Sequence, residues 1–118
     1  MSGNICVTSK VVPLTRELVV EYNALDGCDG ERDLSDERVH RIENLIKSGE
    51  FAFLTISVAI LRDRDNKRVR VNAHHRLFTL AQFMDSDQFR AGVPVTIDEV
   101  TMDSADIGKV FDWYDSPW

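Results

Sequence analysis

The spacing of apolar residues changes from a strand pattern to a helix pattern near His74, and this junction constrains the fold more than any other feature. In residues 68–72 charged side chains alternate with valine, as in a strand with one buried face. From residue 75 to residue 84 the apolar residues recur at helical spacing: Leu77, Phe78, Leu80, Ala81 and Met84. We therefore expect a strand that passes directly into a helix through the turn Asn72-Ala73-His74-His75-Arg76-Leu77.

Two further helices are predicted upstream of this turn. Thr15 is a suitable N-cap for a helix that ends before Gly27, and Ser35 is a suitable N-cap for a second helix that ends at Gly49. Asp36 and Glu37 would place negative charge in the first turn of the second helix, where the helix dipole favours it. The expected buried stripes are Leu18, Val19, Tyr22 and Leu25 in the first helix, and Val39, Ile42, Leu45 and Ile46 in the second.

The remaining segments predict strands and a last helix. Residues 51–61 partly alternate and are rich in β-branched residues, so we expect a strand packed on one face, joined through the polar tip 62–67 to the strand at 68–72. Residues 26–33 read as an exposed loop, 93–97 as a further strand, and 107–114 as a helix capped by Asp103 or Ser104. The order helix, helix, strand, strand, helix, strand, helix predicts an α+β fold, and 118 residues predict a single domain over 1–118.

Composition and charge narrow the classes of function. No stretch approaches the roughly 20 apolar residues of a membrane helix, and no basic-then-apolar secretory signal begins the chain, so we expect a cytoplasmic protein without a membrane partner. Cys6 and Cys28 are far apart, and we expect unpaired thiols. A net charge of -6 disfavours broad DNA binding. Positive charge is nevertheless concentrated in one basic segment, which contains Arg62, Arg64, Lys67, Arg68 and Arg70. This segment can attract a nucleotide, or it and the acidic C-terminal third can simply be two solvated faces.

The strand-to-helix turn is the candidate anion site. The first turn of a helix presents backbone N–H groups and the positive end of the helix dipole, which together attract phosphate. Arg76 can bond two phosphate oxygens, and His75 can donate a further hydrogen bond. The alternative is that His74 and His75 are packing residues; zinc is disfavoured, because His40 is the only other histidine and neither cysteine has ligand spacing.

The turn and its flanks resemble the ParB/sulfiredoxin-like superfamily. Members carry a helix after an arginine, then a strand closing on a turn of the type G-x-H-R or G-E-R-R. This chain is most like phage-encoded ParB-like proteins, whose turn commonly reads N-G-Q-H-R-L. Leu14-Thr15-Arg16-Glu17-Leu18 is similar to their opening helix, and Val110-Phe111-Asp112-Trp113-Tyr114-Asp115 to their L-F-x-x-I-D segment. The resemblance implies a small mixed sheet with helices and a nucleotide or phosphate site formed by Asn72, His74, His75, Arg76 and Arg32.

Three departures from the family pattern limit what the resemblance implies. Ala73 stands where the family has glycine, so a positive φ angle there would strain the backbone. His74 stands where sulfiredoxin has its cysteine, so we expect no sulfiredoxin activity. These 118 residues hold no helix-turn-helix or dimerisation tail, so we do not expect a chromosome-partition role.

Three functions are consistent with these features. The first is a nucleotide- or phosphate-binding domain, with or without NTPase or phosphodiesterase activity on a nucleoside triphosphate with Mg²⁺; Glu50, Asp63 and Asp65 are its candidate carboxylates, without a specific motif. The second is a DNA nuclease or DNA-binding protein that uses the basic hairpin. The third is a non-enzymatic phage protein that binds a host protein through aromatic residues near the C-terminus: Trp113, Tyr114 and Trp118.

Overall fold

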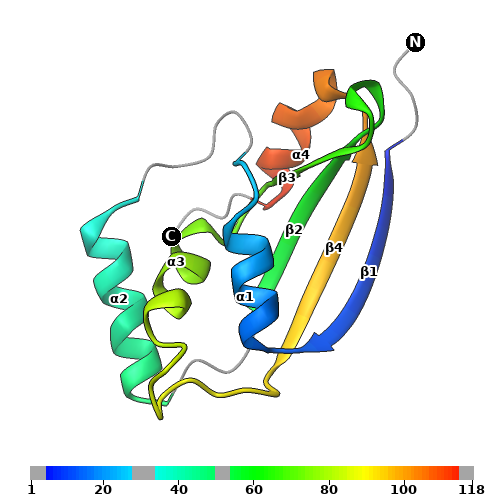
Figure 1. The fold of residues 1–118 in the computed structure, drawn as a ribbon. Coiled ribbons are helices and arrows are strands. Elements are labelled where there is room, and N and C mark those ends of the chain that lie inside the picture. Colours follow the sequence, from blue (N-terminus) through cyan, green and yellow to red (C-terminus); the bar gives the residue numbers. More distant parts are fainter. Residues whose placement is uncertain (1–4, 28–33, 50–53, 115–118) are drawn as a thin grey trace.

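A mixed four-stranded sheet organises the fold. The computed structural model describes residues 5–27, 34–49 and 54–114. Strands β1 (Cys6–Pro13), β4 (Pro94–Met102), β2 (Leu54–Leu61) and β3 (Lys67–Arg70) lie side by side in that order, with β2 parallel to β4 and the other two pairs antiparallel (Figure 1). Four α-helices accompany the sheet: α1 (Arg16–Asn23), α2 (Asp36–Lys47), α3 (His74–Gln82) and α4 (Ile107–Tyr114). The predicted α+β class is confirmed.

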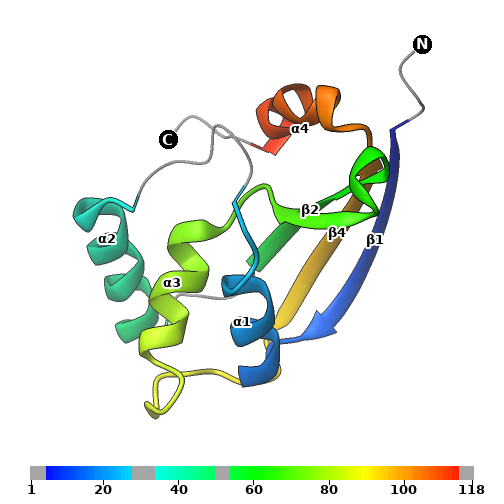
Figure 2. The same cartoon turned by 45° about the horizontal axis from the view of Figure 1, so that its top comes forward.

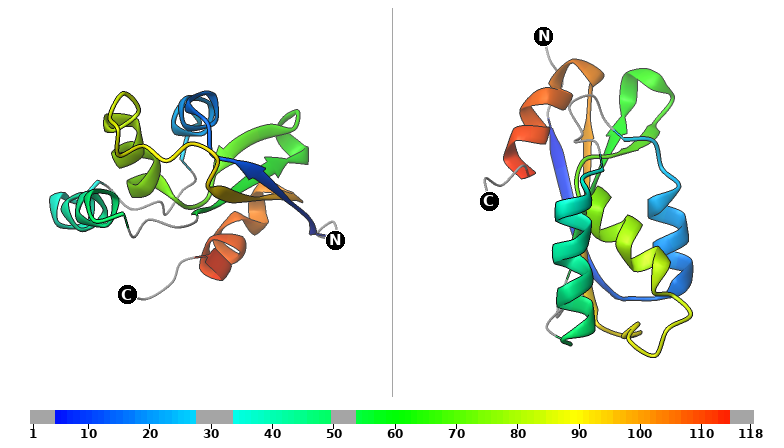
Figure 3. Two further views of the ribbon diagram at one scale, coloured as in Figure 1. Left: turned by 90° about the horizontal axis from the view of Figure 1, so that it is seen from below. Right: turned by 90° about the vertical axis from the view of Figure 1, so that its left-hand side faces the viewer.

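The helices divide between the two faces of the sheet. Helices α1 and α3 cover one face, α2 packs on the outside of α3, and α4 covers part of the other face (Figures 2 and 3). The larger core lies under α1, α2 and α3 and contains Leu14, Val19, Tyr22, Ile46, Leu54, Ile56, Val58, Leu77, Leu80, Val95 and Ile97. The smaller core lies under α4 and contains Ala59, Leu61, Val69, Val71, Val100, Met102 and Val110.

Strand β2 lies in the interior of the sheet. Leu54, Ile56 and Val58 belong to the larger core, and Ala59 and Leu61 to the smaller one. The expectation that this strand packs on one face is therefore wrong, because both faces are buried and α4 packs on the second one. Ser57 is fully buried on that second face.

Strand β1 was not predicted, although residues 5–12 are largely apolar. It pairs with β4 along its whole length, from Cys6 opposite Thr101 to Pro13 opposite Pro94. Seven of its eight residues are exposed, so its sequence lacks the apolar alternation of a half-buried strand. Pairing with β4, rather than burial of one face, makes this segment a strand.

Both predicted N-caps are confirmed. The Thr15 hydroxyl accepts a hydrogen bond from the Leu18 N–H at 3.1 Å, and the Ser35 hydroxyl accepts one from the Arg38 N–H at 3.4 Å. Gly49 has a φ of 76°, in agreement with its predicted role at the end of α2.

The buried stripe predicted for α2 is too wide. Ile46 is buried, whereas Leu45 is 38% exposed. The reason is that α2 packs mainly on α3, so only a narrow strip of its surface is covered. Among the described residues, no helix is long and apolar enough to cross a membrane.

The start of α4 is held differently from our expectation. A 3-10 turn at Ser104–Asp106 precedes α4, and Asp103 makes no side-chain capping bond there. Instead, the N–H and the hydroxyl of Ser104 donate to the two carboxylate oxygens of Asp63, at 2.8 and 2.5 Å. The tip of the β2–β3 hairpin is thereby fastened to the segment that leads into α4.

Candidate functional site

The candidate site is the turn between β3 and α3, and its backbone has the left-handed conformation that glycine favours. Ala73 is the N-cap residue of α3, with φ 70° and ψ 15°. Helix α3 begins immediately afterwards, at His74, and the Leu77 N–H donates to the Ala73 carbonyl at 2.9 Å. Ala73 therefore has a positive φ angle that an alanine adopts only with strain.

Asn72 joins the turn to the central strand. Its side-chain oxygen accepts a hydrogen bond from the Ser57 N–H at 2.6 Å, and the Val71 N–H donates to the Ser57 carbonyl at 2.8 Å. The Asn72 side chain thus continues the hydrogen bonding between β2 and the returning chain beyond the end of β3. Its oxygen points at the backbone of β2, so this atom holds the turn in place.

His75 joins the turn to α2. The ring is buried, and its Nε2 accepts a hydrogen bond from the Ser35 N–H at 3.0 Å. An accepting Nε2 carries no proton, so the neutral ring has its proton on Nδ1. This bond holds the N-terminal ends of α2 and α3 side by side at one end of the helical layer (Figure 2).

His74 and Arg76 complete the first turn of α3, and both are half-buried. The His74 ring lies 5.9 Å from the His75 ring, centroid to centroid, at an angle of 55°. Burial lowers the pKa of Arg76, but a guanidinium remains protonated at neutral pH. A cation that has lost part of its hydration gains more from a nearby anion than an exposed one does.

The predicted basic segment is largely engaged within the chain. Three of its cations form ion pairs with nearest atoms 3.2–3.5 Å apart: Arg62 with Asp103, Lys67 with Asp26, and Arg68 with Glu21. Arg70 is buried, and its Nη1 donates to the carbonyls of Tyr22, Asn23 and Leu25 at 3.0–3.2 Å, at the end of α1. These contacts reduce the positive field that the hairpin can offer to a polyanion.

The candidate carboxylates do not gather at the turn. Asp63 and Asp65 lie at the tip of the hairpin, at the opposite end of β3 from Ala73. Four strand residues separate the tip from the turn, roughly 13 Å at the usual rise of a strand. Asp63 is occupied by Ser104, and those hydrogen bonds hold the pKa of its carboxyl below the ordinary range. Glu50 lies outside the described residues, as does Arg32.

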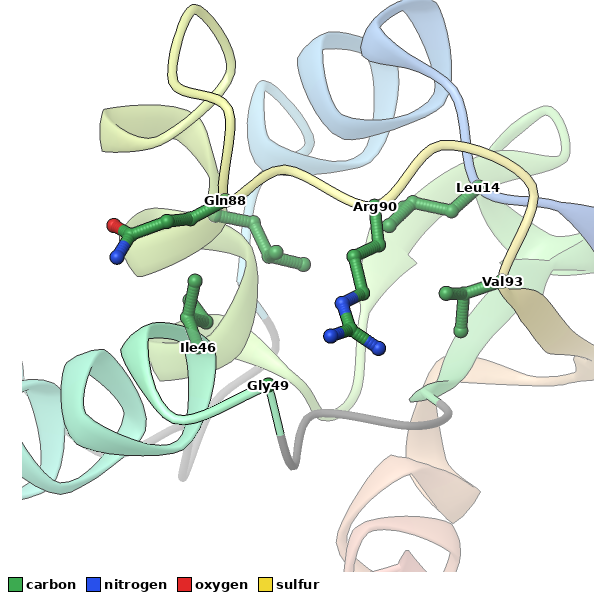
Figure 4. Close-up of a pocket in the computed structure, with 7 residues that line it drawn as sticks. Leu14, Ile46, Gly49, Gln88, Arg90 and Val93 are labelled. Atoms are coloured by element: carbon green, nitrogen blue, oxygen red, sulfur yellow. The ribbon is translucent and has the colours of Figure 1, made fainter.

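A small hollow lies toward the other end of α3, away from the turn. It is lined by Leu14, Ile46, Gly49, Leu80, Gln88, Arg90 and Val93, and the Arg90 side chain extends toward Gly49 (Figure 4). It encloses about 10 Å³, room for one water molecule at most. A Cβ on Gly49 would lie 2.6 Å from the end of the Arg90 side chain, which is flexible and could move aside, so glycine is favoured here by its φ of 76°. The hollow is too small for a ligand.

Sequence reasoning found the turn but missed the two residues that hold it. Ser35 was assigned only as a helix cap, and Ser57 as an ordinary strand residue. Their partners, His75 and Asn72, are 40 and 15 positions away along the chain. Both contacts use the serine backbone N–H, which every residue except proline carries, so no residue pattern could have revealed them.

Comparison with known proteins adds no relative. No protein-family model, no curated protein and no solved structure matches this chain.

Proposed function

We propose that this chain is a phosphate-binding domain of the ParB/sulfiredoxin-like type, which holds the phosphate groups of a nucleotide at residues 73–76. The observation that carries the proposal is the left-handed Ala73 at the N-cap of α3, with Arg76 in the first helical turn. An alanine in this conformation has a cost of about 1–2 kcal/mol. Backbone strain of this kind is concentrated at ligand sites.

The chemistry of the turn supports an anion. The first-turn amides of a helix have no acceptor within the helix, and most helices supply one from a Ser, Thr, Asp or Asn at the N-cap. Ala73 has no side-chain oxygen to offer. A bound phosphate would accept from these amides, interact with the positive end of the helix dipole, and pair with Arg76.

The four predicted contact residues of the turn divide into two roles in this proposal. Asn72 and His75 orient the turn, since their acceptor atoms face the backbone of Ser57 and Ser35. His74 and Arg76 belong to the first turn, from which they would contact the phosphate. Arg32 stays a proposed contact on the strength of the resemblance alone.

Binding is better supported than hydrolysis. Phosphoryl transfer needs a metal ion or a residue that positions water, in addition to groups that stabilise the charge on phosphate. The described candidates Asp63 and Asp65 lie at the far end of β3. The proposal extends to an NTPase or phosphodiesterase activity with Mg²⁺ in the cytoplasm of a phage-infected cell. Release of inorganic phosphate from a nucleoside triphosphate tests the first activity, and cleavage of a chromogenic phosphodiester tests the second.

The alternative functions have less support. A nuclease or DNA-binding role would use the basic hairpin, where Lys67, Arg68 and Arg70 already have partners within the chain. A role as a host-binding protein would use the exposed Trp113 of α4. Tyr114, expected to assist, packs on the smaller core and donates to Asp98 at 2.9 Å. Trp118 lies outside the described residues.

A thermal-shift experiment with matched arginine variants tests the proposal. ATP, CTP, GTP, ADP, pyrophosphate and short DNA are added to the wild type, to Arg76→Gln and to Arg41→Gln, each with and without Mg²⁺. Arg41 is the control because it is an exposed arginine of α2 whose ion-pair partner among the described residues is the exposed Glu37. A ligand at about 100 times its Kd stabilises the folded state by about 2.7 kcal/mol, a rise of roughly 10 °C in Tm for a domain of this size.

We expect a phosphate-bearing ligand to raise the Tm of the wild type and of Arg41→Gln, and to leave that of Arg76→Gln unchanged. Equal shifts in all three proteins would place the binding elsewhere. No shift with any ligand would refute the nucleotide proposal, and a shift with DNA alone, lost at high salt, would favour the nuclease alternative.

A further inference from the structure

The two edges of the sheet are built differently. The outer edge of β3 is short and covered: Gly27 pairs with Arg70, and the Arg70 N–H donates to the Asp26 carbonyl at 2.7 Å. The outer edge of β1 runs for eight residues, and among the described residues no segment pairs with it (Figure 1). Natural sheets usually protect a long edge with charge, proline or a covering segment.

The residues of β1 suit a protein partner better than solvent. Val7 is 51% exposed and Val11 is 68% exposed, and both lie on the same face as Ser9 because side chains alternate along a strand. Lys10 is the only charged residue in the strand. A long, exposed and mostly uncharged edge is a template for another strand.

We propose that β1 is the interface of a symmetric dimer, in which two copies of this chain pair antiparallel through their outer edges about a two-fold axis at Ser9. This register opposes Val7 to the partner's Val11 and Val11 to the partner's Val7. The exposed valines would then form two cross-strand apolar pairs on one face, the contact that stabilises antiparallel strands. The two sheets become one sheet of eight strands.

Charge and chain length select this register among the symmetric ones. An axis at Lys10 would oppose two lysines, and an axis at Val11 would oppose Ser9 to the partner's Pro13, which has no N–H to donate. An axis at Ser9 pairs residues 6–12 of the two strands and opposes Lys10 to the partner's Thr8.

The same register is electrostatically complementary. Thr8 is the neighbour of Glu99 across the sheet, and Lys10 already lies 4.0 Å from Glu99 within one chain. In the dimer the partner's Lys10 would stand in the same row as Glu99. The partner's Lys10 would then lie two strands from Glu99, roughly 10 Å between backbones, and no two like charges are directly opposed.

The assembly would also close at two chains. A two-fold interface uses the same surface on both copies, so each long open edge is consumed by the other. The edges that remain are the two outer edges of β3, which are four residues long and are bridged by Gly27 at Arg70. Growth into a longer sheet therefore has only a short further template.

Charge substitutions test both the interface and its register. Sedimentation velocity across a dilution series should find the wild type at twice the monomer mass of 13.4 kDa. Val7→Lys combined with Val11→Lys opposes introduced lysines and should raise the dimer Kd at least about tenfold. Val7→Lys combined with Val11→Glu opposes introduced lysine to introduced glutamate and should restore the dimer. Val20→Lys, at a 55% exposed valine of α1, should have no effect.

A cross-linking experiment keeps the proposal testable if the charged variants fold poorly. Ser9→Cys, in a background with Cys6→Ser and Cys28→Ser, would bring two sulfurs together at the axis, since opposed residues of antiparallel strands have Cα atoms about 4.5–5.5 Å apart and disulfides accept this separation. Mild oxidation should yield a covalent dimer, and Val20→Cys in the same background should not. A wild type that stays monomeric at the highest concentrations, or equal cross-linking of both variants, would overturn the proposal.

Discussion

Replacing Ala73 with glycine isolates the backbone strain in the turn between β3 and α3. Ala73 has a φ of 70°, where the Cβ of an L-residue crowds the backbone. Glycine has no Cβ and adopts this conformation freely. The substitution also has two costs: a more flexible unfolded chain, and the loss of a methyl group that packs against the larger core.

Ala81→Gly is the matched control. Ala81 lies in the same helix, is also half-buried, and also packs against the larger core. Its backbone is helical, so Ala81→Gly should destabilise the chain by about 0.5–1 kcal/mol. The entropy and methyl terms are shared by the two variants and cancel in their difference. What remains is the strain at Ala73, and we expect Ala73→Gly to be more stable than Ala81→Gly by about 1–2 kcal/mol.

Urea denaturation followed by circular dichroism measures this difference. The two variants should unfold with the same dependence on urea and with separate midpoints, and their Tm values should differ by roughly 4–8 °C. Equal stability of the two glycine variants would refute the assignment of Ala73 to the left-handed region, and with it the structural basis of the proposed phosphate turn.

Three further perturbations have defined outcomes. Asn72→Ala should lower the free energy of unfolding by about 1–3 kcal/mol, because it leaves the N–H of the buried Ser57 without an acceptor. Asn72→Asp keeps the accepting oxygen. Urea midpoints measure the stability of the two variants. Arg70→Ala should lower the free energy of unfolding by about 3 kcal/mol and speed hydrogen exchange at the end of α1. The reason is that the three carbonyls at the end of α1 lose the charged guanidinium as their donor. Carboxyl NMR should show the pKa of Asp63 below its ordinary 3.8, because the Ser104 hydroxyl and N–H favour the carboxylate, and Ser104→Ala should raise it.

The sign of the pH effect follows from the direction of that shift. A carboxyl with a lowered folded pKa stabilises the folded state above its unfolded pKa, near pH 4, and loses this contribution as the pH falls through the folded pKa. Asp63→Asn should therefore flatten the acid side of the plot of stability against pH.

The exposed Asn44→Ala is the control for Asn72→Ala, and the half-exposed Arg68→Ala is the control for Arg70→Ala. Losses of stability no larger than those of the controls would contradict the structural roles of Asn72 and Arg70.

Local chemistry was sufficient for much of the fold. Thr15 and Ser35 cap their helices as expected because an N-cap acts within three residues of chain. The hairpin and the passage from strand into α3 were also predicted, because the change of apolar period is a local property. β1 escaped prediction because its exposed side chains follow no apolar pattern and its partner is β4, about 90 residues away along the chain.

The candidate site divides in the same way. The sequence by itself determined that a strand runs into a helix at residues 72–76, that an arginine stands in the first turn, and that the residue before the helix is an alanine. Only the tertiary structure decided that Ala73 has a positive φ, that Asn72 and His75 hold the turn to β2 and α2, and that Arg70 caps α1. The physical reason is distance along the chain: caps and periodicity act over a few residues, whereas these contacts join segments 15 to 48 residues apart, which meet only when the cores on both faces of the sheet have formed.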